Sequence, residues 1–430
     1  MKTFWARVSC AGSQYSSSAH SGGGKTSEEE LDASRARMVE WNVQNLVKLL
    51  NKVVSRRKAV HGSTVSGDGV IATMPSLYPG STFLEEVQEI IELPQFDDSL
   101  DGAHQENVSN EVVAELRIYV TEIGRMYRDN PFHNFHHASH VSMSVMKLMA
   151  RIVAPSSADM ELPEDSRAST LHDHTYGITS DPLTQFACAF SALIHDVDHR
   201  GVDNLQLMKE QPSLGSLYQN RSVAEQNSLE IGWNLLMEDR FATLRSSLFA
   251  SQDDFVRFRH LVVNGVMATD INDKELKGLR NERWAKAFDP TTDETERDAR
   301  NRKATIVIEH LIQASDISHT MQHWYIYRKW NELLFEELYA AFKTGRSASN
   351  PADFWAKGEI GFFDFYIIPL AKKLKDCGVF GVSSDEYLNY AMANREEWLN
   401  KGEEVVAEMV EKFKNRDYSQ VSCKSAKCQL

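Results

Sequence analysis

Residues 192–201, ALIHDVDHRG, concentrate ionisable side chains directly after an apolar run. His195, Asp196, Asp198 and His199 fall within five positions. The apolar residues before them are typical of a buried helix, and burying carboxylates and imidazoles without partners costs several kcal/mol. A bound metal ion would offset this cost, because imidazole nitrogens and carboxylate oxygens are common ligands of divalent cations.

Histidines elsewhere in the chain are clustered as well. Nine of the fifteen histidines fall in the windows 133–140, 195–199 and 310–323. His133 and His137 are four residues apart, so on a helix they share a face and can address one site. Asp316 follows an apolar run, as expected for a buried helix that presents a carboxylate. A single histidine is more often a core or surface residue, but the joint pattern favours a metal site.

A set of histidines and carboxylates has a defined chemistry. It suits Zn²⁺ or a similar divalent ion, and ligand positions left to water are typical of a catalytic site. A carboxylate such as Asp196 can bridge two ions. Two neighbouring ions can deprotonate a shared water and neutralise phosphoryl oxygens during in-line displacement. The residues therefore predict phosphoester hydrolysis.

The composition limits the class of protein and its partners. The chain has 430 residues, 42% of them hydrophobic, and can hold one large or two medium domains. Its net charge of −14 gives no electrostatic footprint for nucleic acid. Five scattered cysteines suit a reducing compartment, and the chain shows neither a secretory leader nor an apolar run of about 20 residues. We therefore expect a cytoplasmic protein, membrane-tethered only if it is part of a larger receptor.

Three regions differ in composition along the chain. Residues 1–26 are rich in Ser and Gly and predict a flexible tail. Residues 27–81 predict an amphipathic connector helix and a linker, and a coiled coil that forms a homodimer is the alternative for that helix. Residues 82–430 show an almost wholly helical pattern and predict an all-α catalytic domain. Within it, residues 155–180 predict a loop insertion, whose LHDH sequence (171–174) has no apolar scaffold and is not expected to bind metal.

Five motifs occur in a fixed order in this helical region: FHNFHHASHV, HDVDHRGVDN, MATD, ASDISH and GEIGFFDF. In this order they resemble the class I cyclic nucleotide phosphodiesterases, from about residue 110 to about residue 415. The resemblance implies a compact multi-helix domain of the HD type, with a binuclear metal site where helices meet. It also implies hydrolysis of the 3′-phosphoester bond of cyclic AMP or cyclic GMP to a 5′-nucleoside monophosphate.

The resemblance assigns roles to individual side chains. It implies that a zinc ion is held by His137, His195, Asp196 and Asp316. Asp196 would also contact a second ion, usually magnesium or manganese, which Glu225, Thr269 and Asp270 would reach through waters. A hydroxide bridging the two ions would attack the cyclic phosphate. His133 would protonate the departing O3′ as general acid, with His199 near the phosphate.

The chain departs from the family pattern at three places. Phe132 stands where the family usually has Tyr, and Asn227 and Ser228 replace a common histidine pair. Neither change removes a metal ligand. The third departure is Glu359, which occupies the place of the purine-reading glutamine three residues before Phe362.

The base pocket follows from the same register. Phe362 and Leu334 would clamp the base, with His319, Tyr327 and Trp330 nearby. Apolar burial does not distinguish one base from another, so a polar group at the edge of the base must provide the specificity. An ionised Glu359 accepts hydrogen bonds only, so it suits the N1 and N2 donors of guanine and favours cyclic GMP. Three alternatives stay open: a protonated Glu359 that mimics glutamine, a base that presents another edge to Glu359, and a glutamate exposed at a helix end.

Two rival functions and one fusion hypothesis complete the expectations. Another HD-type phosphohydrolase would tend to lack the GEIGFF segment, and a non-catalytic cyclic nucleotide sensor would not need the acid His133. The N-terminal MKTFWARV resembles, over about five residues, the last strand of class III nucleotide cyclase domains. The chain would then be a fragment of a fused cyclase and phosphodiesterase.

Overall fold

The described part of the chain is helical throughout. The computed structural model describes residues 27–61, 83–97, 106–152, 164–289 and 291–418, and these ranges contain helices, turns and no strand. The all-α prediction is therefore confirmed over these residues. The tail 1–26 and the linker after residue 61, up to residue 82, lie outside them, as does the cyclase-like N-terminal segment.

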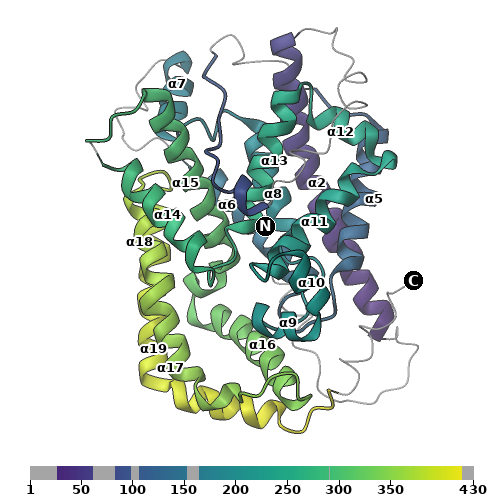
Figure 1. Cartoon of the computed structure of the whole chain (residues 1–430), viewed down its shortest axis with the longest axis vertical. Helices are drawn as coiled ribbons and strands as arrows, with labels where there is room; N and C mark the ends of the chain where they lie inside the picture. Colours follow the sequence, from purple (N-terminus) through teal and green to yellow (C-terminus); the bar gives the residue numbers. More distant parts are fainter. Residues whose placement is uncertain (1–26, 62–82, 98–105, 153–163, 290, 419–430) are drawn as a thin grey trace.

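The described residues form the helices labelled in Figure 1. The first half contains α2 (Ser27–His61), α4 (Phe83–Glu86), α5 (Asn110–Met126), α6 (Phe135–Ala150), α7 (Glu164–His174), α8 (Pro182–Ile194), α9 (Asn204–Glu210), α10 (Pro212–Leu217), α11 (Val223–Met237), η4 (Asp239–Phe241) and α12 (Ala242–Leu248). The second half contains α13 (Gln252–Met267), α14 (Lys274–Ala287), α15 (Glu296–Asp316), η5 (Ser318–Met321), α16 (Trp324–Lys343), η6 (Pro351–Asp353), α17 (Trp355–Phe362), η7 (Phe363–Ile367), α18 (Ile368–Asp376) and α19 (Val382–Phe413). None of these helices is long and apolar enough to cross a membrane.

Helix α8 forms the centre of the fold. Eleven of its residues are buried, because it is apolar on all sides and packs against α2, α6 and α13. Pro182 opens it at N1, where a missing N–H costs nothing. The helix ends at Ile194, so the ionisable residues that follow it are placed in the interior. Helices α16 to α19 lie together at the lower left in Figure 1, on the far side from α2.

Helix α2 corrects the connector interpretation of residues 27–81. The expected helix is present, but it packs against α5 and α8 rather than leading away from the domain. Val43, Leu46 and Leu50 are at most 1% exposed and belong to the same hydrophobic core as α8. The periodic stripe that suggested a connector or a dimerising helix is thus buried inside the chain.

Helix α7 corrects the prediction of a loop at residues 155–180. Residues 164–174 are helical, and residues 153–163 lie outside the described part. The sequence has no apolar stripe here, so helical periodicity could not be recognised; tertiary contacts decide instead. His172 is 1% exposed, its Nδ1 lies 2.5 Å from Oγ of Ser180, and its ring packs on Phe96. It is not part of the histidine and aspartate cluster described below.

Candidate active site

Four side chains far apart in the sequence meet where three buried helices come together. His137 lies in the first turn of α6, His195 and Asp196 follow α8, and Asp316 is the last residue of α15. Nε2 of His137 lies 3.0 Å from Oδ1 of Asp316 and 3.6 Å from Oδ2 of Asp196. Nε2 of His195 lies 3.0 Å from Oδ2 of Asp196 and 3.4 Å from Oδ1 of Asp316. Two imidazole nitrogens and two carboxylates therefore converge on one point.

The local backbone structure orients the side chains of this cluster. Oδ1 of Asn134 caps α6 by accepting the backbone N–H groups of His136 and His137, which fixes the first turn. Nδ1 of His195 donates to the carbonyl oxygen of Ala192 at 2.9 Å, so Nε2 faces the cluster. Although that Nε2 is buried, it has no hydrogen-bond partner among the described residues. A buried imidazole nitrogen that faces two carboxylates and has no hydrogen-bond partner fits a metal ligand.

The electrostatics of the cluster also fit a cation. Burial alone would raise the pKa of both carboxyl groups. The charge and hydrogen bond of His195 instead hold the pKa of Asp196 well below the usual carboxyl range, and hydrogen bonds with His137 and His195 do the same for Asp316. The two carboxylates are thus ionised in the interior, where negative charge is costly without a counter-ion. The donor set of two imidazoles and two carboxylates suits zinc.

A second group of acidic residues lies beside the first. Burial and the charge of Asp270 raise the pKa of Glu225 to about 8, and the charge of Asp196 adds to the effect. Oδ1 of Asp270 accepts the backbone N–H groups of Asn272 and Asp273, and Oγ1 of Thr269 donates to Val266. Mutual repulsion between Glu225, Asp270 and Asp196 would be relieved by a second cation of the kind that prefers oxygen ligands.

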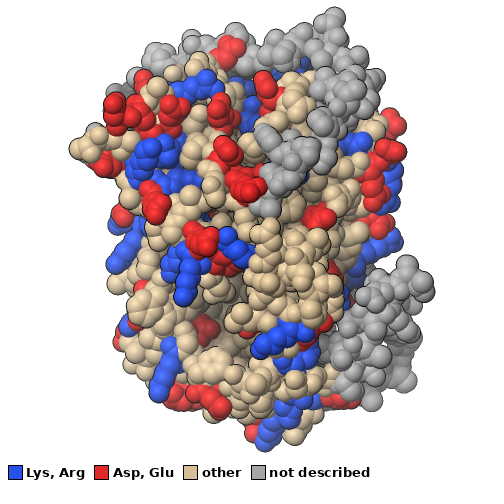
Figure 2. All heavy atoms as spheres, in the orientation of Figure 1, with Lys and Arg blue, Asp and Glu red and all other residues tan. Residues whose placement is uncertain are grey.

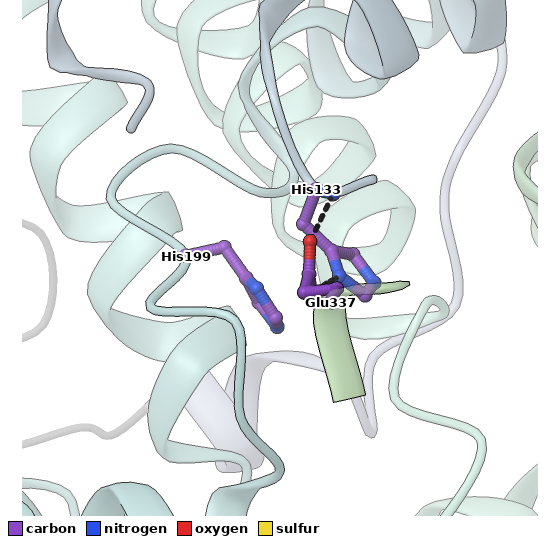
Figure 3. A group of neighbouring side chains, drawn as sticks. All are labelled: His133, His199 and Glu337. Carbon is purple, nitrogen blue, oxygen red and sulfur yellow. Dashed lines mark hydrogen bonds and ion pairs between the residues drawn. The ribbon is translucent and has the colours of Figure 1, made fainter. Parts of the chain in front are cut away.

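His133, His199 and Glu337 form a third group (Figure 3). Oε1 of Glu337 lies 2.5 Å from Nδ1 of His133, and Oε2 accepts the backbone N–H groups of Phe132 and His133 at 2.9 Å. Burial opposes protonation, but the charge of Glu337 raises the pKa of His133 to about 9. His133 is therefore an imidazolium at neutral pH. The rings of His133 and His199 have their centroids 3.9 Å apart.

The third group is better suited to proton transfer than to metal binding. Its ligand atoms lie close enough together to hold an ion, but Nδ1 of His133 is taken by Glu337. Nδ1 of His199 accepts the backbone N–H of Gly201 at 3.2 Å, which places the ring proton on Nε2. Burial and the charge of His133 lower the pKa of His199 to about 4, so this ring stays neutral.

Glu337 is the functional residue that the sequence did not reveal. It stands in the amphipathic segment 324–343, where a glutamate is typical of the solvent face. The structure instead buries it in α16, with a side chain 3% exposed. Its position one turn after Leu334 was the only available signal, and it could not be separated from the neighbouring Glu336.

The expected base pocket is built around a buried glutamate. Glu359 of α17 is 8% exposed, so the alternative of an exposed glutamate at a helix end is wrong. The hydroxyl of Tyr327 donates to Oε2 of Glu359 at 2.5 Å, and Nε1 of Trp398 donates to Tyr327 at 2.7 Å. Burial raises the pKa of Glu359 to about 7, although the Tyr327 hydrogen bond acts in the opposite direction. Both protonation states are therefore accessible near neutral pH.

The remaining predicted pocket residues are buried or half-buried. Leu334 and Phe362 are half-buried at the edge of the core, and Phe362 stacks on Tyr366 with centroids 5.4 Å apart. His319 is buried in η5, and the ring of Phe132 packs against His137, His319 and Trp330. The two other departures are accommodated without loss of a ligand, since Oγ of Ser228 donates to Val197 while Asn227 is half-buried.

The surface is hollowed between α14 and α16, and acidic side chains show red inside the hollow (Figure 2).

Comparison with known proteins places these features in one family. A profile of the 3′5′-cyclic nucleotide phosphodiesterase family matches residues 132–379. The chain is 27% identical over 266 residues to the dual specificity calcium/calmodulin-dependent 3′,5′-cyclic nucleotide phosphodiesterase 1C of Mus musculus, covering 59% of this chain and 32% of the relative. It is 25% identical over 278 residues to the probable 3′,5′-cyclic-AMP phosphodiesterase pde-4 of Caenorhabditis elegans, covering 61% and 36%.

A solved structure shows the same fold. The crystal structure of the phosphodiesterase domain of Salpingoeca rosetta rhodopsin phosphodiesterase matches with a TM-score of 0.52 at 20% identity, covering 83% of this chain and 97% of that domain. The chain spans about a third of the length of the curated relatives named above. Since the family profile covers more than half of it, the chain belongs to the 3′5′-cyclic nucleotide phosphodiesterase family, a family of enzymes.

Proposed function

We propose that this chain hydrolyses 3′,5′-cyclic nucleotides to 5′-nucleoside monophosphates by cleaving the 3′-phosphoester bond. One observation carries the proposal: the cluster of His137, His195, Asp196 and Asp316 lies beside a protonated His133. A cluster suited to activating water and an acid suited to releasing an alkoxide are the two parts that this hydrolysis needs. Membership of the phosphodiesterase family supports the same reaction.

Two groups of residues would hold metal ions. His137, His195, Asp196 and Asp316 suit a zinc ion, while Asp196, with Glu225, Thr269 and Asp270 acting through waters, suits magnesium or manganese. When bound, such ions activate water and neutralise the charge of phosphoryl oxygens. The protein supplies ionised carboxylates and an imidazole whose Nε2 already faces them.

The other side chains handle protons and orient the phosphate. His133 donates its proton to O3′ as the P–O3′ bond breaks, and the charge of Glu337 keeps that proton in place until then. His199 is neutral with its proton on Nε2, so it donates a hydrogen bond to a phosphoryl oxygen. The adjacent rings thus have different roles set by their hydrogen bonds.

Guanine is the base that we propose for the pocket. The ionised carboxylate of Glu359 accepts hydrogen bonds only, which suits N1–H and N2–H of guanine and opposes the N1 acceptor of adenine. Its rigid support by Tyr327 and Trp398 favours a reading role over a flexible one. Comparing kcat/KM for the two nucleotides in the wild type and Glu359→Gln tests this proposal. An unchanged ratio would show that Glu359 does not read the base.

A single assay separates the main proposal from its rivals. The purified chain is given cyclic AMP, cyclic GMP and non-cyclic nucleotides with Mg²⁺ or Mn²⁺, and again after chelation. We expect hydrolysis of cyclic nucleotides alone, lost with chelator and restored by metal. Hydrolysis of non-cyclic nucleotides only would indicate another HD-type phosphohydrolase. Binding of a cyclic nucleotide without turnover would indicate a sensor, a role that would not require His133.

A further inference from the structure

The C-terminal end of α8 uses its free carbonyl groups to build the site. The last carbonyls of a helix have no intrahelical partner and must bond elsewhere. Here the oxygen of Ala192 accepts from His195, that of Leu193 accepts from the hydroxyl of Tyr127, and that of Ile194 accepts from the N–H of Val197. Three successive carbonyls are thus each given a separate partner.

Tyr127 connects two backbone groups of this region through one oxygen atom. It follows α5 as its C-cap and is 3% exposed. Its hydroxyl donates to Leu193 at 2.9 Å and accepts the backbone N–H of Asp196 at 3.3 Å. The ring lies against Phe135 at the start of α6, with centroids 5.8 Å apart. The hydroxyl therefore bonds on both sides of the turn that presents His195 and Asp196.

Two residues that follow Tyr127 in the same segment make parallel contacts. Arg128 pairs with Asp198 at 2.6 Å, and Asp198 has a φ of 64°, a left-handed conformation that is costly for this residue type. Nδ2 of Asn130 donates to the carbonyl oxygens of His133 and His199 at 2.9 and 2.7 Å. Residues 127–130 therefore join the segment carrying the acid to the segment carrying the ligands.

We infer that Tyr127 is a positioning residue, whose hydroxyl fixes the backbone of Asp196 relative to His133. The kinetic test of this inference rests on the proposed function. A second test measures how long the protein retains its metal and does not require the reaction. The hydroxyl touches no reacting atom, so its effect passes through Asp196. Groups that orient metal ligands typically change metal affinity or activity by about 10- to 100-fold when mutated.

Tyr127→Phe removes the hydroxyl and keeps the ring. The N–H of Asp196 and the carbonyl of Leu193 then lose their partner, and the turn after α8 gains freedom. We expect kcat to fall by about 10-fold or more, with KM changed less, because the Tyr127 hydroxyl is buried and already bonded to Leu193 and Asp196. We also expect faster loss of bound zinc to a chelator, measured by elemental analysis against time.

Tyr119→Phe is a matched control from the neighbouring helix α5. Tyr119 is fully buried, and its hydroxyl donates to the backbone carbonyl of Gly232, which is not one of the predicted metal ligands, at 2.8 Å. Both variants lose a buried tyrosine hydroxyl, so both should lower the thermal midpoint. Only Tyr127→Phe should change kcat and the rate of zinc loss.

The outcomes separate this inference from the proposed function. Equal kinetic and zinc-release behaviour in the two variants would overturn the positioning role. If the wild type hydrolyses no cyclic nucleotide, the proposed function fails, and zinc release still decides the role of Tyr127. Faster zinc release in Tyr127→Phe alone would support it even then.

Discussion

Glu337 and His133 form a pair in which both carboxylate oxygens serve the same residue. Oε1 lies 2.5 Å from Nδ1 of the imidazole, while Oε2 accepts the backbone N–H of His133 and of Phe132. The carboxylate therefore fixes the backbone and the ring together. The charge of His133, opposing the effect of burial, lowers the pKa of Glu337 to about 2, so the pair is ionic across the neutral range.

The first prediction concerns Glu337→Gln. The amide keeps a hydrogen-bonding shape but loses the charge that raises the pKa of His133. His133 should then lose its proton at a lower pH, so the alkaline limb of the kcat profile should move to lower pH. Since general acid catalysis contributes roughly 10²- to 10⁴-fold, we expect kcat at pH 8 to fall by at least about 10-fold. Profiles from pH 6 to 10 measure both effects.

Glu336→Gln is the control for that prediction. Glu336 is the adjacent residue of α16, is also buried, and pairs with Arg416 instead of a histidine. It should leave the alkaline limb in place. The proposed acid role of His133 would be contradicted by an unshifted limb in Glu337→Gln.

The second prediction concerns metal binding at Asp316. Asp316→Asn removes one of two buried charges, and we expect the zinc content of purified protein to fall well below that of the wild type. Because metal bound only to the folded state stabilises it, by about 2.7 kcal/mol at 100 times Kd, chelation should lower the thermal midpoint of the wild type. The same chelation should have little effect on Asp316→Asn.

Asp173→Asn provides a comparison from the similar LHDH segment. Asp173 is exposed and lies near Arg300 at 3.5 Å, outside the histidine and aspartate cluster. We expect full zinc content in this variant. Equal zinc content in Asp316→Asn and the wild type, by elemental analysis, would remove Asp316 from the ligand set.

The sequence is most informative where clustered ionisable residues follow an apolar run of helical spacing. Clustered imidazoles and carboxylates beside apolar runs indicated a metal site, because they are costly to bury unless a cation neutralises them. The choice of His137, His195, Asp196 and Asp316 as its ligands came from the resemblance to the phosphodiesterase motifs. Glu337 could not be selected, because one glutamate on an amphipathic helix does not reveal which face meets another segment. The burial of Glu359 depended in the same way on partners from α16 and α19.

The differences in the fold have a related cause. Helical periodicity identified α2, but which surface covers its stripe depends on contacts with α5 and α8. Helix α7 is polar, and its position depends on the contact between His172 and Ser180. No hydrophobic periodicity in the sequence predicts that contact. Hydrophobic periodicity thus predicts helices and their apolar faces, whereas tertiary contacts determine which surface each face packs against.

The third prediction is a pH-dependent gain in stability from Glu359→Gln. The pKa of Glu359 is raised from its ordinary value of 4.5 to about 7 in the folded state, so the folded protein binds this proton more tightly than the unfolded chain. Stability should therefore fall as pH rises from about 4.5 to 7. At pH 8 the variant avoids ionising a buried carboxyl, a gain on the order of 3 kcal/mol.

Urea unfolding at pH 5 and pH 8 measures this gain. At pH 5 the wild-type carboxyl is mostly protonated when folded, and the two proteins should differ little. At pH 8 the variant should have the higher midpoint. Glu403→Gln, at an exposed position of α19, should behave as the wild type at both values. An equal difference at both pH values would show that packing, not ionisation, separates the variants.

The last prediction is that base selectivity changes with pH. Below its pKa of about 7, Glu359 carries a proton and can donate to the N1 acceptor of adenine; above it, only acceptor oxygens face the base. The ratio of kcat/KM for cyclic GMP to that for cyclic AMP should therefore rise between pH 6 and pH 8. A change of one hydrogen bond, about 1 kcal/mol, corresponds to several-fold in this ratio. Titration of His133 affects both substrates alike and cancels from it.

Glu359→Gln isolates the carboxyl group in that measurement. An amide does not titrate, so the ratio in the variant should stay constant across the same range while the separate kcat/KM values still change with pH. A constant ratio in the wild type would contradict a reading role for an ionised Glu359. A slope shared by both proteins would place the titrating group elsewhere in the pocket, because Tyr327 and Trp398 are retained in each.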